Sequence, residues 1–172
     1  IAGVDEVGRG CIAGPVTAAA VILDPENIPK GLNDSKKLSL KNREKIFHSI
    51  QNKCTFYVAH SSVSEIDQIN ILQASLLAMK RAIDGLSISP DFVLIDGNKS
   101  PKGLDSKFET IIKGDSKSLS IAAASIVAKI TRDRIMSRLD KEFPGYDWSQ
   151  NAGYPTKFHK SALLNIGITP HH

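Results

Sequence analysis

The stretch Ile1-Ala2-Gly3-Val4-Asp5-Glu6-Val7-Gly8-Arg9-Gly10 opens the chain, and it decides how the remaining sequence is interpreted. Its apolar residues are those of a buried strand, yet two adjacent carboxylates lie among them. Acidic residues are poor strand formers and are rarely buried without a partner. A divalent cation would balance both charges, whereas an edge strand that runs into a polar turn is the plainer alternative. The glycines flanking Arg9 allow the backbone to approach a ligand closely, and arginine suits phosphate.

The length and composition indicate a single domain with an ordinary hydrophobic core. The chain has 172 residues, of which 41% are hydrophobic and 23% are charged. No apolar run reaches about 18 residues, so we expect neither a membrane span nor a signal peptide. The net charge of +4 weakly favours a polyanionic partner. Cys11 and Cys54 lack metal-ligand spacing, so we expect two reduced thiols in a cytoplasmic protein.

Hydrophobic patterning predicts a mixed sheet with helices on its faces. Two strands come first, and strands then alternate with helices, which favours this α/β arrangement. The Ala-rich start of the last long helix, 122–124, indicates close packing of that helix on the sheet. Predicted strands cover 1–8, 14–23, 54–62, 91–96 and 110–113, and predicted helices cover 39–51, 64–85 with a break near Asn70, 120–139 and 157–165.

Four carboxylates occupy positions where a ligand site would form. Asp5 and Glu6 lie in the first strand, Asp96 ends the fourth, and Asp115 precedes the Ala-rich helix. Ligands gather beyond strand ends in open α/β sheets, so the acids of strands one and four become neighbours if those strands are adjacent. Such oxygens suit Mg²⁺ or Mn²⁺, and two of these ions can promote phosphodiester cleavage. Because strand neighbours point to opposite faces, Glu6 joins Asp5 only through local twist or at an edge.

Five short blocks occur in one order along nearly the whole chain: Asp5-Glu6-Val7-Gly8-Arg9-Gly10, Asp34-Ser35-Lys36-Lys37-Leu38, Ile95-Asp96-Gly97, Lys113-Gly114-Asp115 with 121–129, and Gly153-Tyr154-Pro155. The series resembles ribonuclease HII, the bacterial type 2 ribonuclease H. The first and fourth blocks are highly specific together, whereas Ile95-Asp96-Gly97 alone is not. The related ribonuclease HIII has Gly-Thr-Gly where this chain has Gly8-Arg9-Gly10, which favours type HII.

The resemblance implies a fold and a metal site. The fold is a ribonuclease H-like mixed five-stranded sheet flanked by helices. Residues 1–145 form the catalytic domain in this interpretation, and 146–172 form a small C-terminal helical appendage packed on the same domain. The family's four catalytic, metal-binding acids hold two Mg²⁺ or Mn²⁺ ions, and the residues that resemble them are Asp5, Glu6, Asp96 and Asp115.

The resemblance also implies substrate contacts. Gly8, Arg9 and Gly10 resemble the loop that recognises the 2′-hydroxyl of a ribonucleotide, and Tyr154 resembles the tyrosine that packs on the following sugar. A salt bridge between Arg9 and an acid, and a core or turn role for Tyr154, are the plainer alternatives. Ser35, Lys36 and Lys37 resemble a segment of the family that contacts phosphate. The alternative is that the two lysines are simply solvated charges.

Two basic residues of the Ala-rich helix, Lys129 and Arg132, lie about one turn apart. We interpret them as a solvated basic face or as partners of Asp133. Phosphate contact is the alternative interpretation.

By resemblance, the expected activity is metal-dependent hydrolysis of the RNA strand of RNA–DNA hybrids. Duplex DNA would be cut on the 5′ side of an embedded ribonucleotide, as in ribonucleotide excision repair, leaving 3′-hydroxyl and 5′-phosphate ends. We expect a monomer with nucleic-acid substrates and no membrane partner. A nuclease of the same fold that acts on DNA is one alternative. A module that binds hybrids without cutting is another, although four acids would repel a polyanion unless metals neutralised them.

Overall fold

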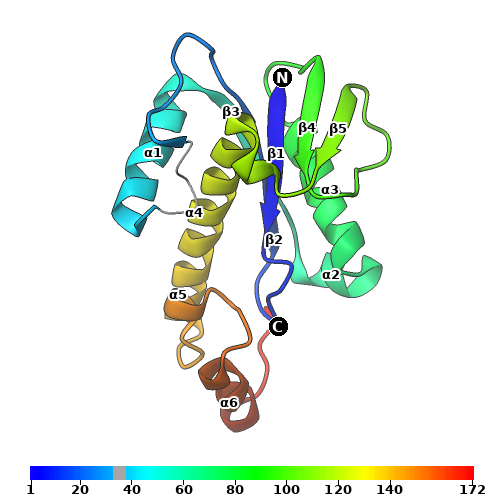
Figure 1. Cartoon of the computed structure of the whole chain (residues 1–172). Coiled ribbons are helices and arrows are strands. Elements are labelled where there is room, and N and C mark those ends of the chain that lie inside the picture. Colours follow the sequence, from blue (N-terminus) through cyan, green and yellow to red (C-terminus); the bar gives the residue numbers. More distant parts are fainter. Residues whose placement is uncertain (33–37) are drawn as a thin grey trace.

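The computed structural model describes residues 1–32 and 38–172, and a five-stranded sheet runs through its centre (Figure 1). The strand order is β3-β2-β1-β4-β5. β1, β2 and β3 pair antiparallel, whereas β4 pairs parallel to both β1 and β5. The predicted mixed sheet is therefore confirmed. The strands are β1 (Ala2–Val7), β2 (Val16–Ile22), β3 (Thr55–Ser61), β4 (Phe92–Asp96) and β5 (Lys107–Ile111).

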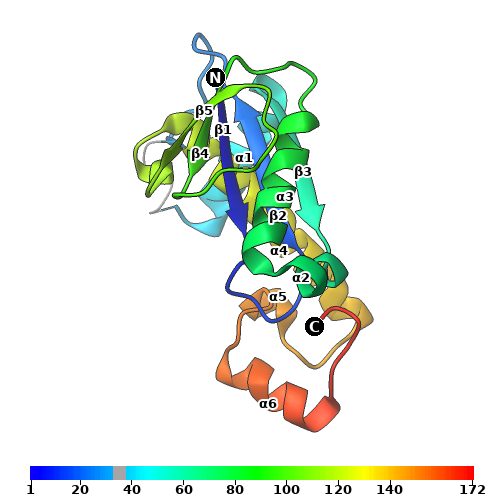
Figure 2. The same ribbon diagram turned by 90° about the vertical axis from the view of Figure 1, so that its right-hand side faces the viewer.

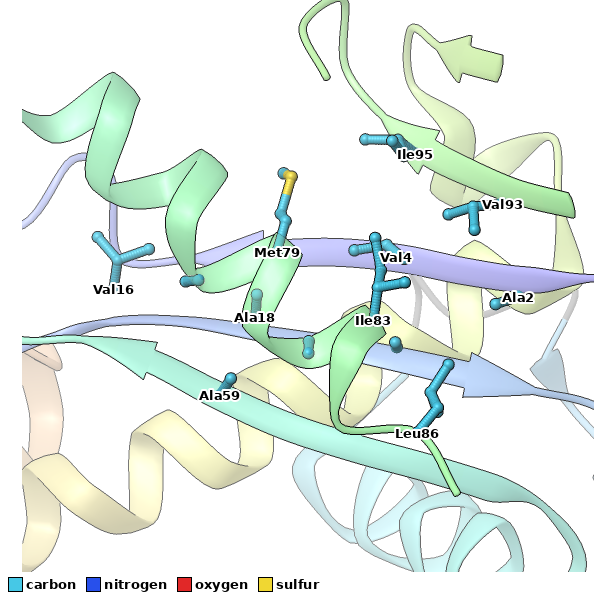
Figure 3. Packing of buried hydrophobic residues seen from close by; sticks show 13 residues of the cluster. Ala2, Val4, Val16, Ala18, Ala59, Met79, Ile83, Leu86, Val93 and Ile95 are labelled. Atoms are coloured by element: carbon cyan, nitrogen blue, oxygen red, sulfur yellow. The ribbon is translucent and has the colours of Figure 1, made fainter. Parts of the chain in front are cut away.

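Helices cover both faces of the sheet. α3 (Ile71–Asp84) packs on one face, where Met79 and Ile83 face Val4 and Ile95 in a wholly apolar cluster (Figure 3). α1 (Leu40–Lys53) and α4 (Leu119–Glu142) pack on the other face (Figure 1). Alternate residues of a strand point to opposite faces, so β1 places Val4 toward α3 and Asp5 toward the α4 side.

α4 lies unusually close to β1. A Cβ atom at Gly3 would lie 2.1 Å from the carbonyl carbon of Ser120, so only glycine fits at this position. The three alanines 122–124 are buried beside this contact. The close helix-to-sheet packing predicted from these alanines is confirmed, and it draws the turn before α4 toward the ends of β1 and β4.

Several local differences separate the predicted elements from the observed ones. β5 begins at Lys107 and ends at Ile111, earlier than the predicted 110–113, because it is an exposed edge strand whose first three residues lack an apolar pattern. The long helix ends at Glu142 rather than 139. A short helix, α5 (Trp148–Asn151), was not predicted, and the turn Gly114–Ser116 forms a single 3₁₀ turn.

The C-terminal residues pack around Trp148. This buried ring lies in one apolar cluster with Tyr146 and Ala162, the latter from α6 (Lys157–Ile166), and with Ala13 and Met136 of the rest of the chain. The division at residue 145 stays a prediction. No helix of the described residues is both long and apolar enough to cross a bilayer. Both cysteines are free thiols, as expected.

The predicted helix break at Asn70 is confirmed, because α2 (Val63–Ile69) ends there and α3 begins there. The Asn70 side chain accepts a hydrogen bond from the Gln73 N–H at 3.0 Å, and its own N–H donates to Ile66 at 2.9 Å. Its φ of 72° lies in the left-handed region, which asparagine tolerates better than most residues.

We expect Asn70→Ala to lower the free energy of unfolding by about 1–2 kcal/mol, because it removes the cap and strains the backbone. Asn70→Gly tolerates the positive φ, so we expect it to lower the free energy of unfolding by only about a few tenths of a kcal/mol. Urea unfolding midpoints of the two variants check this prediction. Equal costs for alanine and glycine would contradict it.

Candidate active site

The parallel pairing of β1 with β4 brings Asp5 and Asp96 to the same edge of the sheet. Ala2 pairs with Val93 and Val4 pairs with Ile95. One further step along both strands brings Asp5 level with Asp96. The condition stated from the sequence, that the first and fourth strands are adjacent, is therefore met.

Asp5 is a buried carboxyl group with acidic neighbours. Asp96 lies close enough to act on the Asp5 carboxyl group electrostatically. Burial is the largest cause that raises the pKa of Asp5 well above its ordinary value, and the charges of Glu6 and Asp96 raise this pKa further. The N–H of Glu6 donates to Asp5 Oδ1 at 2.8 Å and lowers the same pKa. A bound cation would offset the negative charge of these acids.

Glu6 joins these acids from the end of β1. Burial raises the pKa of Glu6, and Arg9 lowers it. Glu6 Oε2 is buried, and it has no hydrogen-bond partner among the described residues. Arg9 Nη1 lies 3.7 Å from Glu6 Oε1, so the salt bridge considered for Arg9 is present. The Arg9 side chain remains 49% exposed, so this pair leaves it open to solvent and contributes little stability.

Asp115 follows a turn that is bound to Asp96. The N–H of Gly114 donates to Asp96 Oδ1 at 2.6 Å, and the N–H of Gly97 donates to the carbonyl of Ile111 at 2.9 Å. These bonds tie the ends of β4 and β5 to the turn before α4. Asp115, the next residue along the chain, is half-buried there.

These acids fit a divalent cation through their excess negative charge. In the part of the chain that the structure describes, no three His, Cys, Asp or Glu side chains converge as a preformed metal site. The charges of Asp5, Glu6 and Asp96 nevertheless act on one another. A hard cation would neutralise this buried charge and would provide a partner for the unpaired oxygen of Glu6. The roles of the four acids as metal ligands stay a prediction.

The loop at Gly8–Gly10 and Tyr154 lie side by side, although they are far apart in sequence. A Cβ atom at Gly10 would lie 3.4 Å from Tyr154 Cε1. The N–H of Ile12 donates to the carbonyl of Gly153 at 2.9 Å, which joins the two segments. Tyr154 is 40% exposed, so it is not a core residue. Ser35, Lys36 and Lys37 lie outside the described residues.

The basic residues of α4 have different surroundings. Lys129 pairs with Asp133 at 3.1 Å, as one interpretation proposed. The interpretation of Arg132 was wrong, because this residue is fully buried and donates to backbone carbonyls that include those of Ala13 and Pro15. A charged guanidinium inside the protein needs such acceptors, which a solvated helix face does not require.

Comparison with known proteins identifies the family. Residues 2–172 match the family model described as Ribonuclease HII. The chain belongs to the ribonuclease HII family. A ribonuclease HII from Ruegeria pomeroyi is 60% identical over 172 residues, which are all of this chain and 74% of that protein. As a member of this family, the chain is an endoribonuclease, and the resemblance found in its sequence is confirmed.

Solved structures confirm the ribonuclease H-like fold. The crystal structure of the ribonuclease H2 from Pyrococcus horikoshii OT3 superimposes with a TM-score of 0.79 at 28% identity, over 99% of this chain and 90% of that chain. The crystal structure of Bst-RNase HIII in complex with Mn²⁺ gives a TM-score of 0.71 at 20% identity, over 96% and 69% of the two chains. The second likeness concerns the fold alone.

We expect the metal-free protein to lose stability as pH rises from the ordinary pKa of an aspartate through the raised pKa of Asp5, and Asp5→Asn to lose less. The carboxyl group of Asp5 keeps its proton in the folded state because its pKa is raised there, whereas the same group in the unfolded chain releases the proton. Stability is therefore fully present below the unfolded pKa and is lost as pH rises through the folded pKa. Thermal unfolding with a chelator measures this difference.

Mn²⁺ is expected to raise the melting temperature of the wild-type protein more than that of Asp5→Asn. Asp91→Asn is the matched control, because Asp91 is an exposed acid just before the start of β4. If the stability of the wild type and that of Asp5→Asn changed equally with pH, the predicted pH dependence would be contradicted.

Proposed function

We propose that this chain hydrolyses the RNA strand of RNA–DNA hybrids and cuts duplex DNA on the 5′ side of an embedded ribonucleotide. The products would carry 3′-hydroxyl and 5′-phosphate ends. The observation that supports this most directly is the neighbouring pair of carboxyl groups, buried Asp5 and half-buried Asp96, in a member of the ribonuclease HII family. The hybrid-binding module without activity is set aside, because the family is one of endoribonucleases.

The cofactor in this proposal is a pair of Mg²⁺ or Mn²⁺ ions. Bound at the site, such ions supply an activated water and stabilise charge on the departing oxygen. The ligands would be the four acids Asp5, Glu6, Asp96 and Asp115. Hard oxygen ligands of this kind suit both ions, and a Mn²⁺ complex of a ribonuclease HIII with the same fold has been solved.

The chain's own residues would then position the substrate. A nuclease that acts on RNA within a duplex has to detect the 2′-hydroxyl, which both donates and accepts hydrogen bonds. The backbone of the Gly8–Gly10 loop, which is exposed at Arg9 and Gly10 and buried at Gly8, would approach this group closely, and Arg9 would contact a phosphate. The exposed ring of Tyr154 lies against Gly10 and could pack on the sugar that follows. Ser35, Lys36 and Lys37 would contact phosphate.

Three duplexes of one sequence test the proposal: an RNA–DNA hybrid, a DNA duplex with one ribonucleotide, and an all-DNA duplex. With Mg²⁺ or Mn²⁺ the first two are expected to be cut and the third left intact, and a chelator is expected to stop all cutting. Cleavage of the all-DNA duplex would favour the DNA nuclease considered as the alternative. Mapping the product ends locates the cut bond.

Asp96→Asn is expected to lower kcat on the hybrid by about 100-fold or more, because it removes a ligand charge while keeping the shape of the side chain. Asp91→Asn is the matched control at the other end of the same strand, and it should keep wild-type activity. Normal cleavage by Asp96→Asn at ordinary Mg²⁺ concentrations would overturn the proposal.

Tyr154→Ala is expected to lower kcat/KM on the single-ribonucleotide duplex by about 10-fold or more, and to affect the hybrid less. A hybrid offers many registers in which a ribonucleotide meets the site, whereas the single-ribonucleotide duplex offers one. Steady-state kinetics on both substrates measure the ratio. An equal loss on both would contradict the role assigned to the ring.

The proposed setting is a monomer in the cytoplasm that takes part in ribonucleotide excision repair. The single-ribonucleotide duplex is the substrate that such repair requires. Sedimentation of the free protein and of its complex with this duplex tests the monomer.

A further inference from the structure

The side chain of Arg132 is 1% exposed and lies between two segments that are distant in sequence. Its Nε donates to the carbonyl of Pro15 and its Nη2 to that of Ala13, each at 2.8 Å. Its Nη1 donates to the carbonyl of Ala152. All three nitrogens of the guanidinium therefore bind backbone oxygens, two after β1 and one after α5.

Three glycines form the surroundings of this guanidinium. A Cβ atom would lie 2.6 Å from Nε at Gly8, 2.9 Å from Nη2 at Gly14 and 3.3 Å from Nη2 at Gly153. Each of these glycines also has a positive φ, of 105°, 85° and 90° respectively. Side chains at these positions would displace the guanidinium or strain the backbone, so both segments are shaped around Arg132.

The same two segments carry the proposed recognition residues. Gly8 begins the Gly8–Gly10 loop, and Gly153 directly precedes Tyr154. The loop after β1 and the segment after α5 lie side by side between the sheet and α6 in both views (Figures 1 and 2). The guanidinium therefore connects the elements that would meet the 2′-hydroxyl and the following sugar.

We infer that Arg132 is a positioning residue that fixes the Gly8–Gly10 loop against Tyr154 and thereby restricts cleavage to the correct ribonucleotide. This inference rests on the proposed function of the loop and of Tyr154. Arg132 itself is buried beneath both segments and does not touch substrate. Its effect would be geometric, since displacement of a positioning group by about 1 Å can cost about 100-fold in rate.

Arginine is required here for its shape. Its planar fork directs separate donors at acceptors on two segments, whereas a lysine carries one amine on a flexible stem. Arg132→Lys keeps the charge and would lose most of the connection. Arg132→Met keeps the apolar stem and removes every donor.

A thiol assay tests the connection without any substrate. Cys11 Sγ lies 3.6 Å from the carbonyl of Ala152, the same oxygen that Arg132 binds, and burial raises the pKa of the Cys11 thiol. Because Arg132 also lowers this pKa, the rates are compared per thiolate, from the pH profile of each variant. In a Cys54→Ala background, we expect Arg132→Met and Arg132→Lys to raise this corrected rate of Cys11 modification by about 10-fold. Arg134→Met is the matched control, because Arg134 lies on the same helix but pairs with Glu44 instead. It is expected to leave the rate unchanged.

Kinetics on two substrates test the consequence. Arg132→Met and Arg132→Lys should raise the ratio of kcat/KM on the hybrid to kcat/KM on the single-ribonucleotide duplex by about 10-fold, the same direction as expected for Tyr154→Ala. Loss of folded protein would lower both activities equally, so the ratio separates positioning from stability. If Arg132→Met does not fold, Gly153→Ala provides the same test, because its Cβ would push against Ala13 at 2.4 Å.

An unchanged thiol rate in the Arg132 variants, or an equal loss on both duplexes, overturns the inference. Failure of the wild-type protein to cut the single-ribonucleotide duplex overturns the proposed function instead. The thiol rate then still decides whether Arg132 holds the two segments together.

Discussion

The parallel pairing of β1 and β4 forces two carboxyl groups, those of Asp5 and Asp96, to the same edge of the sheet. Burial and the charges of Glu6 and Asp96 hold the pKa of Asp5 well above its ordinary value there. This unfavourable contact is stable only within a firmly packed sheet. The apolar cluster under α3 and the close contact of α4 with Gly3 provide that packing. The arrangement is typical of a site that binds a cation, since a cation removes the repulsion.

Arg132 carries a second buried charge, and unlike the acids it has hydrogen-bond partners within the protein. Arg132 is satisfied entirely by the protein, through carbonyl oxygens of two loops, whereas the carboxylates are left with excess charge. Unpaired buried charge is costly, so its retention in the acidic site points to a function. The satisfied charge of Arg132 points to structure. The unpaired acids are thus linked to chemistry, and the paired arginine is linked to the shape of the neighbouring loops.

Local signals predicted most of the fold. Apolar runs predicted β1, β2 and β4, and Asn70 predicted the break between α2 and α3. Both predictions were possible because strand burial and helix capping depend on residues that are close in sequence. The edge strand β5 was placed too late, since an exposed strand has no apolar alternation to detect. Arg132 was misinterpreted, although Ala128 and Met136, each four residues away, are buried and indicate that Arg132 lies on the same inward face.

The order of sequence blocks was enough to indicate the family and to name the four acids. It could not determine which of them meet, because that depends on β4 pairing beside β1 rather than at another edge. Nor could it place Tyr154 against Gly10, which requires the chain to return after α5. Composition, capping and periodicity act over a few residues and are visible in the sequence. The partner of a buried charge is set by strand order and loop packing, which only the tertiary structure decides.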